Sequence, residues 1–410
     1  LLYTIGSGWD NRGRHFHALF QFQLMGICGA FLTGDAFNLF VFFEILLIAS
    51  YGLMIHSGGK DRLRAGVQYV AFNLVGSSLF LFALAAIYAI TGTLNIADLA
   101  AKAAQLPQGD AALFRVAAVM LMMVFAIKGA LVPLQFWLPG TYSNAPGPVA
   151  ALFAVMTKIG AYSVIRFGVI VLPPGHPITG TLIGDLMLPA ALLTLIIGAL
   201  GILGATTLSR LAAFAAVASM GTAFVAISAF TPASTAAAMY YIIHSTLAGA
   251  ALFLIVDLVA HRRAHDGLHQ ALPPMAQAGL ISGLFMVSAI ATAGMPPLSG
   301  FIGKLLVLDA LRDQAALVWS VILATSLMTV LGFARAGSTV FWKAHASAPE
   351  GEPPSHPPQA LCFVAIGALF AGLVALTLLA GPIMVWMEAT AASLFDPTAY
   401  IAANQLPEVK

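Results

Sequence analysis

Five ionisable side chains lie within stretches that are otherwise apolar, and these residues are the ones best suited to chemistry. Glu44 lies within GDAFNLFVFFEILLIASYGL, Lys128 within MLMMVFAIKGALVPLQFWLP, and Lys158 within AALFAVMTKIGAYSVIRF. His244 lies within YYIIHSTLAGAALFLI, and Lys304 follows a double proline in AGMPPLSGFIGKLLVLD. Carboxylate, ammonium and imidazole groups all exchange protons, so this set predicts proton transfer.

A charge at the centre of a membrane-spanning helix is unfavourable by about 2.5–3.5 kcal/mol on insertion scales. Four such residues together cost roughly 10–14 kcal/mol, which is comparable to the net stability of a whole domain. The simplest alternative is a structural ion pair between Glu44 and one lysine. That pair would account for two groups but not for three lysines and a histidine, so a proton-handling role is favoured.

The composition indicates that these stretches cross a membrane. Of 410 residues, 60% are hydrophobic and 8% are charged, and the mean hydropathy is +0.93. Soluble domains carry about 25% charged residues. The composition therefore excludes a water-soluble enzyme, a nucleic-acid-binding protein and a disordered chain. The net charge of +2 gives no indication of an anionic partner.

A helix that crosses the hydrocarbon layer needs about 20 mostly apolar residues. Eleven windows of this kind are predicted, at 15–33, 36–56, 66–90, 112–132, 149–171, 182–204, 211–230, 236–259, 276–311, 316–341 and 359–386. Their continuous Leu, Ala, Val and Phe runs lack the alternation that a β-barrel requires. The sequence therefore predicts an all-α polytopic membrane protein, with a single membrane domain over 1–410.

Basic residues in the connections orient the chain in the membrane. The basic residues that fall on one side of the eleven spans are Arg12, Arg14, Lys60, Arg62, Arg64, Arg210, Arg262, Arg263 and Lys343. The positive-inside rule places this side in the cytoplasm. The connections 91–111 and 345–358 are polar enough to lie in water, and a short helix is expected near 96–105.

Three further acidic residues lie at the ends of spans. Asp35 precedes Glu44 by nine residues, which places the two carboxylates on opposite helix faces and excludes an acid–base dyad. Asp35 either caps the second span or helps protons to enter the membrane, and the sequence leaves both interpretations open. Asp257 and Asp309 are expected to pair with arginines that follow them within six residues.

No metal site and no cofactor are expected. The histidines in the connections lack carboxylates or cysteines at ligand spacing. Cys28 and Cys362 lie in apolar stretches and are expected to be buried. The sequence has neither a Gly-rich nucleotide loop nor a cysteine cluster for iron–sulfur ligation, so redox catalysis within the chain is not predicted.

Two of the spans are predicted to be broken. The fourth runs into Pro133 and Pro139, and the ninth is interrupted at Pro296 and Pro297. Proline removes a helix hydrogen bond, and irregular backbone at membrane depth persists only where it is buried or lines a wet cavity. A lysine of the ionisable set lies close to each break. Water is expected at these breaks, held by freed carbonyls and by the hydroxyls of Thr141, Ser143 and Ser299.

The broken span is the fourth in each of two groups of five. These groups are about 15–171 and 182–341, and an extra C-terminal helix is predicted at 359–386. An odd number of crossings turns the second group upside down relative to the first. This is the inverted-repeat plan of secondary transporters.

Three long motifs resemble a known family. TGDAFNLFVFFEILLIASYGL, PLQFWLPGTYSNAPGPVAALFAVMTKIGAY and MPPLSGFIGKLLVL are similar, in this order, to the D subunit of Mrp-type (Mnh- or Pha-type) monovalent cation/proton antiporters. That subunit belongs to a larger group with the antiporter-like subunits of respiratory complex I and membrane-bound hydrogenases. Complex I subunits usually carry a histidine shortly before the WLP motif. This chain has Gln135 there, which favours the Mrp branch.

The resemblance implies a fourteen-helix subunit in the bacterial inner membrane, so about three N-terminal helices are expected to be missing here. It implies that Glu44 and Lys128 form a glutamate–lysine pair, that Lys158 is a relay lysine, that His244 lies on the central axis, and that Lys304 ends the row. The implied partners are other membrane subunits of the antiporter, the lipid bilayer, protons, and Na⁺ or K⁺.

These observations lead to one functional hypothesis, in which protons move along a row of these groups in the membrane plane. Burial favours neutral lysine and a nearby carboxylate favours the charged form, so a moving Glu44 would switch whether Lys128 keeps its proton. The chain would then be a transporter subunit and not an enzyme. The alternatives are a proton-pumping subunit of a quinone reductase or hydrogenase, and a scaffold that transports nothing.

Overall fold

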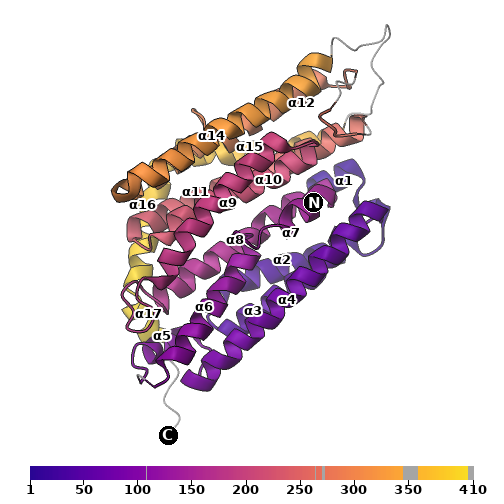
Figure 1. The fold of residues 1–410 in the computed structure, drawn as a ribbon. Helices are drawn as coiled ribbons and strands as arrows, with labels where there is room; N and C mark the ends of the chain where they lie inside the picture. Colours follow the sequence, from indigo (N-terminus) through magenta and orange to yellow (C-terminus); the bar gives the residue numbers. More distant parts are fainter. Residues whose placement is uncertain (108, 264, 270–272, 345–358, 405–410) are drawn as a thin grey trace.

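The computed structural model is a bundle of long α-helices that run roughly along one direction (Figure 1). It describes residues 1–107, 109–263, 265–269, 273–344 and 359–404. In this part of the chain nine helices are long and apolar enough to cross a membrane, and two shorter apolar helices, Phe16–Leu32 and Ala278–Ala293, accompany them. The prediction of an all-α protein with about eleven spans is confirmed. The predicted aqueous connection 345–358 lies outside the described residues.

The first half of the chain holds ten of the elements. They are α1 (Leu2–Ser7), the 3-10 helix η1 (Asp10–Arg12), α2 (Phe16–Leu32), α3 (Ala36–Met54), α4 (Lys60–Thr91), α5 (Ile96–Ala103), α6 (Ala111–Lys128), α7 (Trp137–Asn144), α8 (Gly147–Ile170) and α9 (Leu182–Gly204). Helix α5 is the short helix expected in the connection 91–111. The Asn95 side chain starts α5 by accepting hydrogen bonds from the backbone N–H groups of Ala97 and Asp98.

The second half continues the same architecture. It holds α10 (Leu208–Ser228), α11 (Pro232–Arg263), α12 (Ala278–Ala293), α13 (Ser299–Ala310), the 3-10 helix η2 (Arg312–Gln314), α14 (Ala315–Gly337), the π-helix η3 (Ser338–Trp342), α15 (Ala360–Leu378), α16 (Ala380–Phe395) and α17 (Thr398–Asn404). In Figure 1 the indigo and purple helices of the first half lie beside the magenta and orange helices of the second.

The prediction of one helix over 359–386 is wrong. The spanning helix α15 ends at Leu378, and α16 begins at Ala380 and continues beyond the predicted end. Nineteen residues already suffice to cross the hydrocarbon, and Pro382 fits the first turn of a new helix, where its missing N–H leaves no bond unmade. Helix α16 packs against α11 and α8, and α17 then lies beside α5 (Figure 1).

Both predicted breaks are present, with one change of position. Helix α6 ends at Lys128, irregular backbone including Pro133 follows, and α7 begins at Trp137. Pro139 therefore lies within the first turn of α7 and does not break a helix, because a proline there has no helix hydrogen bond to lose. The second break lies between α12 and α13 and contains Pro296 and Pro297.

Helices at equivalent positions make equivalent contacts in the two halves. In the first half α2 packs on α3, α4 on α6 and α7, and α8 on both α2 and α6. In the second half α9 packs on α10, α11 on α12 and α13, and α14 on both α9 and α12. The first residues of α4 and the last residues of α11 line the same cavity, so these two third helices run in opposite directions. This pattern supports our proposal that 15–171 and 182–341 are inverted repeats.

The polar groups at the helix ends only partly follow the sequence expectations. Asp309 pairs with Arg312 as predicted. Asp257 does not pair with the arginines that follow it; it accepts hydrogen bonds from the Tyr3 hydroxyl (2.6 Å) and the Trp9 indole (3.1 Å). The segment that supplies these donors is about 250 residues away in sequence, so local spacing could not indicate them.

The two cysteines differ in their surroundings. Cys362 is buried as expected, but Cys28 is exposed on the surface of the bundle. The expectation for Cys28 was wrong because an apolar span does not reveal which of its faces packs against protein and which faces lipid.

Candidate functional site

Glu44 of α3 and Lys128 of α6 lie on helices that both pack against α4, and side chains of α4 bind each of them. The Ser77 hydroxyl of α4 donates a hydrogen bond to the Glu44 carboxylate. Lys128, the last residue of α6, is 5% exposed, and its Nζ donates to Asn73 Oδ1 of α4 at 3.1 Å. Among the described residues, no ion pair joins Glu44 to Lys128. The implied glutamate–lysine pair is therefore not formed in this structure. Instead, Ser77 binds Glu44 and Asn73 binds Lys128.

Sequence reasoning missed Asn73 and Ser77 because it searched for charges. Both lie in AFNLVGSSLF, where neutral polar residues interrupt an apolar span. Gly76 lies between them, and a Cβ built there would lie 3.7 Å from Lys128 Nζ. A small residue at this place lets the lysine side chain lie along α4. A polar residue within a span is the signal that could have identified these positions.

Lys158 is buried in the middle of α8, with 3% of the residue exposed. Its Nζ lies 3.2 Å from Ser219 Oγ and 3.0 Å from Met220 Sδ, both on α10. No carboxylate forms an ion pair with Lys158 in the described part of the chain. The partners of Lys158 are a hydroxyl and a thioether, so no opposite charge lies in contact with its ammonium group.

Helix α8 approaches the end of α6 closely at Gly160. A Cβ built on Gly160 would lie 2.6 Å from the backbone nitrogen of Gly129 and 2.8 Å from the carbonyl oxygen of Phe125. The two backbones touch here, and this contact sets the distance between the helices that carry Lys128 and Lys158. No hydrogen bond between described residues joins those two lysines directly.

We expect the Gly160→Ala variant to be destabilised by about 1–3 kcal/mol, because a methyl group at this contact must push two backbones apart. Thermal unfolding of the purified complex measures this effect. Gly367→Ala is a matched control, since Gly367 is also in a spanning helix and nothing lies within 4 Å of a Cβ built there. Equal thermal stability of both variants would contradict the proposed close contact.

His244 and Lys304 lie at the second break. His244 Nδ1 is 2.9 Å from Ser299 Oγ, at the first residue of α13. Lys304 Nζ donates to the Ala293 carbonyl oxygen and to Ser326 Oγ, each at 2.8 Å. Ala293 is the last residue of α12, so Lys304 binds a carbonyl that the break has released from the helix.

At the first break, side chains likewise bind backbone groups that have no helix partner. Trp137 of α7 donates its indole N–H to the carbonyl oxygen of Ile127, at the end of α6, at 3.1 Å. The backbone N–H of Val132 donates to Thr194 Oγ1 of α9 at 2.9 Å. The hydroxyls of this break that were expected to hold water donate instead to carbonyls of their own helix, and they belong to Thr141 and Ser143. Side chains therefore satisfy freed backbone groups at both breaks, as membrane depth requires.

Two small cavities, each of about 20 Å³, lie beside Lys158 of the first half and His244 and Lys304 of the second. One is lined by Lys158 and His244, and the other by Lys304. The residues that line both cavities include Ser219, Tyr241 and Thr292. A space of this size has room for one water molecule, and the hydroxyls among its lining residues can bind one. Lys158, His244 and Lys304 thus form one group, and Glu44 and Lys128 form another.

Asp35 is the N-cap of α3. Its Oδ1 accepts a hydrogen bond of 2.8 Å from the backbone N–H of Asn38. The flanking backbone is held as well, because Ala36 N donates to Leu94 O and Ile96 N donates to Gly34 O. The capping interpretation is therefore correct, and a further part in admitting protons stays a proposal.

Replacing Asp35 separates these two roles. We expect Asp35→Ala to lose about 1 kcal/mol of stability and Asp35→Asn to lose little, because an amide oxygen can accept the same hydrogen bond. Thermal unfolding measures both variants. Asp35→Asn keeps the cap but cannot ionise, so a slower transport rate in that variant supports the proposed role in admitting protons.

Comparison with known proteins places this arrangement in a family. A sequence model of the NADH:quinone oxidoreductase/Mrp antiporter transmembrane family matches residues 33–331. This range is most of the chain and contains every residue of the ionisable set. The chain belongs to this family. The resemblance noted from the three motifs is confirmed.

Relatives in this family match nearly the whole chain. The chain is 37% identical to the D subunit of the Na(+)/H(+) antiporter of Alkalihalophilus pseudofirmus, over 97% of this chain and 79% of the relative. It is 35% identical to the D subunit of a probable K(+)/H(+) antiporter of Rhizobium meliloti, over 95% and 77%. These relatives are bacterial and the chain has many spans, so it is a multi-pass protein of the bacterial plasma membrane.

Solved structures of the family share the fold. A chain of the Mrp complex from Dietzia sp. matches with a TM-score of 0.85 and 27% identity, over 98% of this chain and 82% of that chain. A chain of respiratory complex I from Thermus thermophilus matches with a TM-score of 0.78, over 96% and 82%. Its identity of 24% shows a common fold and nothing further.

Proposed function

We propose that this chain is the proton-translocating subunit of a multisubunit monovalent cation/proton antiporter. The observation that carries this proposal is the agreement along nearly the full chain with subunits named for Na⁺/H⁺ and K⁺/H⁺ antiport. Its partners are then the other membrane subunits of that complex. The chain is a transporter subunit and not an enzyme.

Protons are proposed to move along the row from Glu44 through Lys128, Lys158 and His244 to Lys304. The hydroxyl-lined cavities support the second part of this route, because they connect Lys158 and His244 with Lys304. The first part requires a change of partners, since Lys128 is bound to Asn73 and Glu44 to Ser77.

The energy of the partner exchange at Glu44 is comparable to the energy that one charge gains on crossing the membrane. Swinging Glu44 from Ser77 to Lys128 gives up one hydrogen bond to a charged group, which is worth about 1.5–3 kcal/mol. A potential of 100 mV supplies about 2.3 kcal/mol for each charge that crosses the membrane. The two energies are similar, so a charge that crosses the membrane elsewhere in the complex can supply enough energy to shift Glu44 between its partners, which would decide whether Lys128 keeps its proton.

A reconstituted vesicle assay with the full complex tests the function. Vesicles are acidified inside, and Na⁺ or K⁺ is added outside while a dye reports the internal pH. We expect one of these cations to collapse the pH gradient in vesicles that contain the complex, and not in empty vesicles. An intact complex that responds to no monovalent cation would contradict the proposal.

The fold match to complex I favours a second candidate, an antiporter-like subunit that pumps protons for a quinone reductase or hydrogenase. The proteins that copurify with the chain distinguish the two. Flavin and iron–sulfur proteins would support the second candidate, whereas an assembly made only of membrane proteins would support the antiporter.

A further inference from the structure

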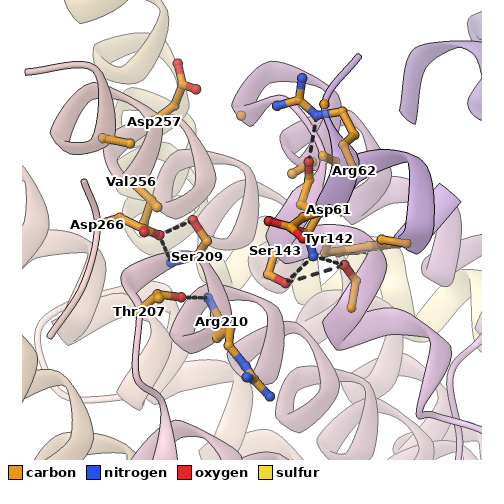
Figure 2. Close-up of a pocket in the computed structure, with 18 of the residues that line it drawn as sticks. Asp61, Arg62, Tyr142, Ser143, Thr207, Ser209, Arg210, Val256, Asp257 and Asp266 are labelled. Carbon is orange, nitrogen blue, oxygen red and sulfur yellow. Dashed lines mark hydrogen bonds between the residues drawn. The ribbon is translucent and has the colours of Figure 1, made fainter. Parts of the chain in front are cut away.

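A large polar cavity opens at the end of the bundle that the basic connections assign to the cytoplasm. Its volume is about 1190 Å³, and it lies between α4, α7 and α8 of the first half and α10 and α11 of the second (Figure 2). The ionisable residues that line it are Arg12, Lys60, Arg62, Arg64 and Arg210, the acids Asp61, Asp257 and Asp266, and His261. We call it the basic cavity. It is distinct from the small cavities around Lys158.

Two of the three acids in the basic cavity are already bound. Asp257 accepts hydrogen bonds from Tyr3 and Trp9, and Asp266 accepts hydrogen bonds from the backbone N–H and the hydroxyl of Ser209. Figure 2 shows the Asp266 carboxylate turned to Ser209 and the Asp257 carboxylate pointing away from Arg210. The five cations of the cavity still outnumber its three acids, and among the described residues none of these acids forms an ion pair with a lysine or arginine of the cavity.

Three of the five cations have no bonded partner. Arg62 donates to the backbone carbonyls of His56, Gly58 and Asn144, which fixes it to the surrounding loops. Within the described residues, the side chains of Lys60, Arg64 and Arg210 make no hydrogen bond, ion pair or ring contact. An excess of positive charge in one concave space is a binding site for an anion.

The backbone adds to this positive charge. Helices α4 and α8 begin at the wall of the cavity, at Lys60 and Gly147, and neither start is capped by a side chain. The first N–H groups of a helix are unpaired and carry the positive end of its dipole, which stabilises phosphate groups. The N-termini of α4 and α8 and the unpaired side chains of Lys60, Arg64 and Arg210 therefore all line the basic cavity.

We propose that the basic cavity binds a phosphate-bearing anion. A free phosphate ion and a phospholipid headgroup share this chemistry. The volume favours the headgroup, because a cavity of this size exceeds what one phosphate ion fills. Its position favours the same source, since basic pockets between spanning helices at the cytoplasmic side bind anionic lipid headgroups.

The bound anion would lie close to the small cavity that Lys158 lines. Ala150 and Phe253 line the basic cavity, while Ala154 and Leu252 line the small cavity that holds Lys158. Ala150 and Ala154 are one helical turn apart, about 6 Å along α8. The positive lining also opposes hydrated Na⁺ and K⁺ at this mouth.

Binding to the intact purified complex tests the proposal. Equilibrium dialysis with radioactive inorganic phosphate measures the free anion. Native mass spectrometry after incubation with phosphatidylglycerol, with phosphatidylcholine as the neutral control, counts retained lipid. Retention of phosphatidylglycerol alone identifies the headgroup as the occupant, and binding of inorganic phosphate as well identifies a general phosphate site; both results support the proposal.

Matched variants locate the site. Arg210→Gln and Arg64→Gln are each expected to weaken binding about tenfold, the loss of one charge-assisted hydrogen bond. Arg14→Gln is the control, because Arg14 lies at the same end of the bundle, is exposed, and does not line the cavity. Arg210→Lys keeps the charge and is expected to retain most of the binding.

Size-exclusion chromatography shows whether each variant complex is intact. Unchanged binding in Arg210→Gln and Arg64→Gln, or an equal loss in Arg14→Gln, would overturn the assignment. So would an intact wild-type complex that retains neither probe. The assay measures binding without transport, so its result is independent of the proposed antiport.

Discussion

Vesicles that carry the Lys128→Ala variant are expected to show no cation-dependent proton movement above the background of empty vesicles. Lys128 is the buried end of α6, and its Nζ contacts only Asn73 among the described hydrogen-bonding side chains. Removing the amine removes the group that would accept and release the proton. Lys128→Arg is expected to fail as well, because a guanidinium keeps its proton under all physiological conditions.

The complex should still assemble in both Lys128 variants, since this lysine makes no ion pair within the described chain whose loss would leave a buried carboxylate alone. Lys343→Ala is the control: Lys343 is exposed at the end of the π-helix η3, away from the proposed row, and it makes no ion pair among the described residues. Dye-reported antiport in everted vesicles measures all three variants. Normal antiport in Lys128→Ala would contradict the proposed route.

The second large effect is expected at Lys304, with a different signature. Lys304→Ala should abolish antiport and also destabilise the protein by about 1–3 kcal/mol, because the Ala293 carbonyl at the break loses its donor. Lys304→Arg keeps the charge and the donors, so it should recover stability while antiport stays absent.

Thermal unfolding and antiport are therefore measured on the same preparations of both Lys304 variants. A purely structural role for Lys304 predicts that Lys304→Arg restores both properties together. Recovery of antiport in Lys304→Arg would therefore show that the lysine supports the break and does not carry the proton.

The sequence alone was sufficient for the all-α fold, for most of the spans and for the broken helices. Insertion into lipid depends on the apolar character of about 20 consecutive residues, which is a local property. A buried charge in such a window is visible for the same reason, as Lys158 in α8 illustrates. The errors, such as the single helix predicted over 359–386, concern where a helix ends and turns, which depends on the helices it then packs against.

The tertiary structure alone decided which groups face each other. It showed that Ser77 binds Glu44 and Asn73 binds Lys128, whereas the family resemblance had implied a direct glutamate–lysine pair. It also gathered Lys60, Arg64 and Arg210 into one cavity, although a net charge of +2 gives no sign of an anion site. Hydropathy is summed along the chain, whereas electrostatic interaction depends on distance in space, and only packing between distant helices sets that distance.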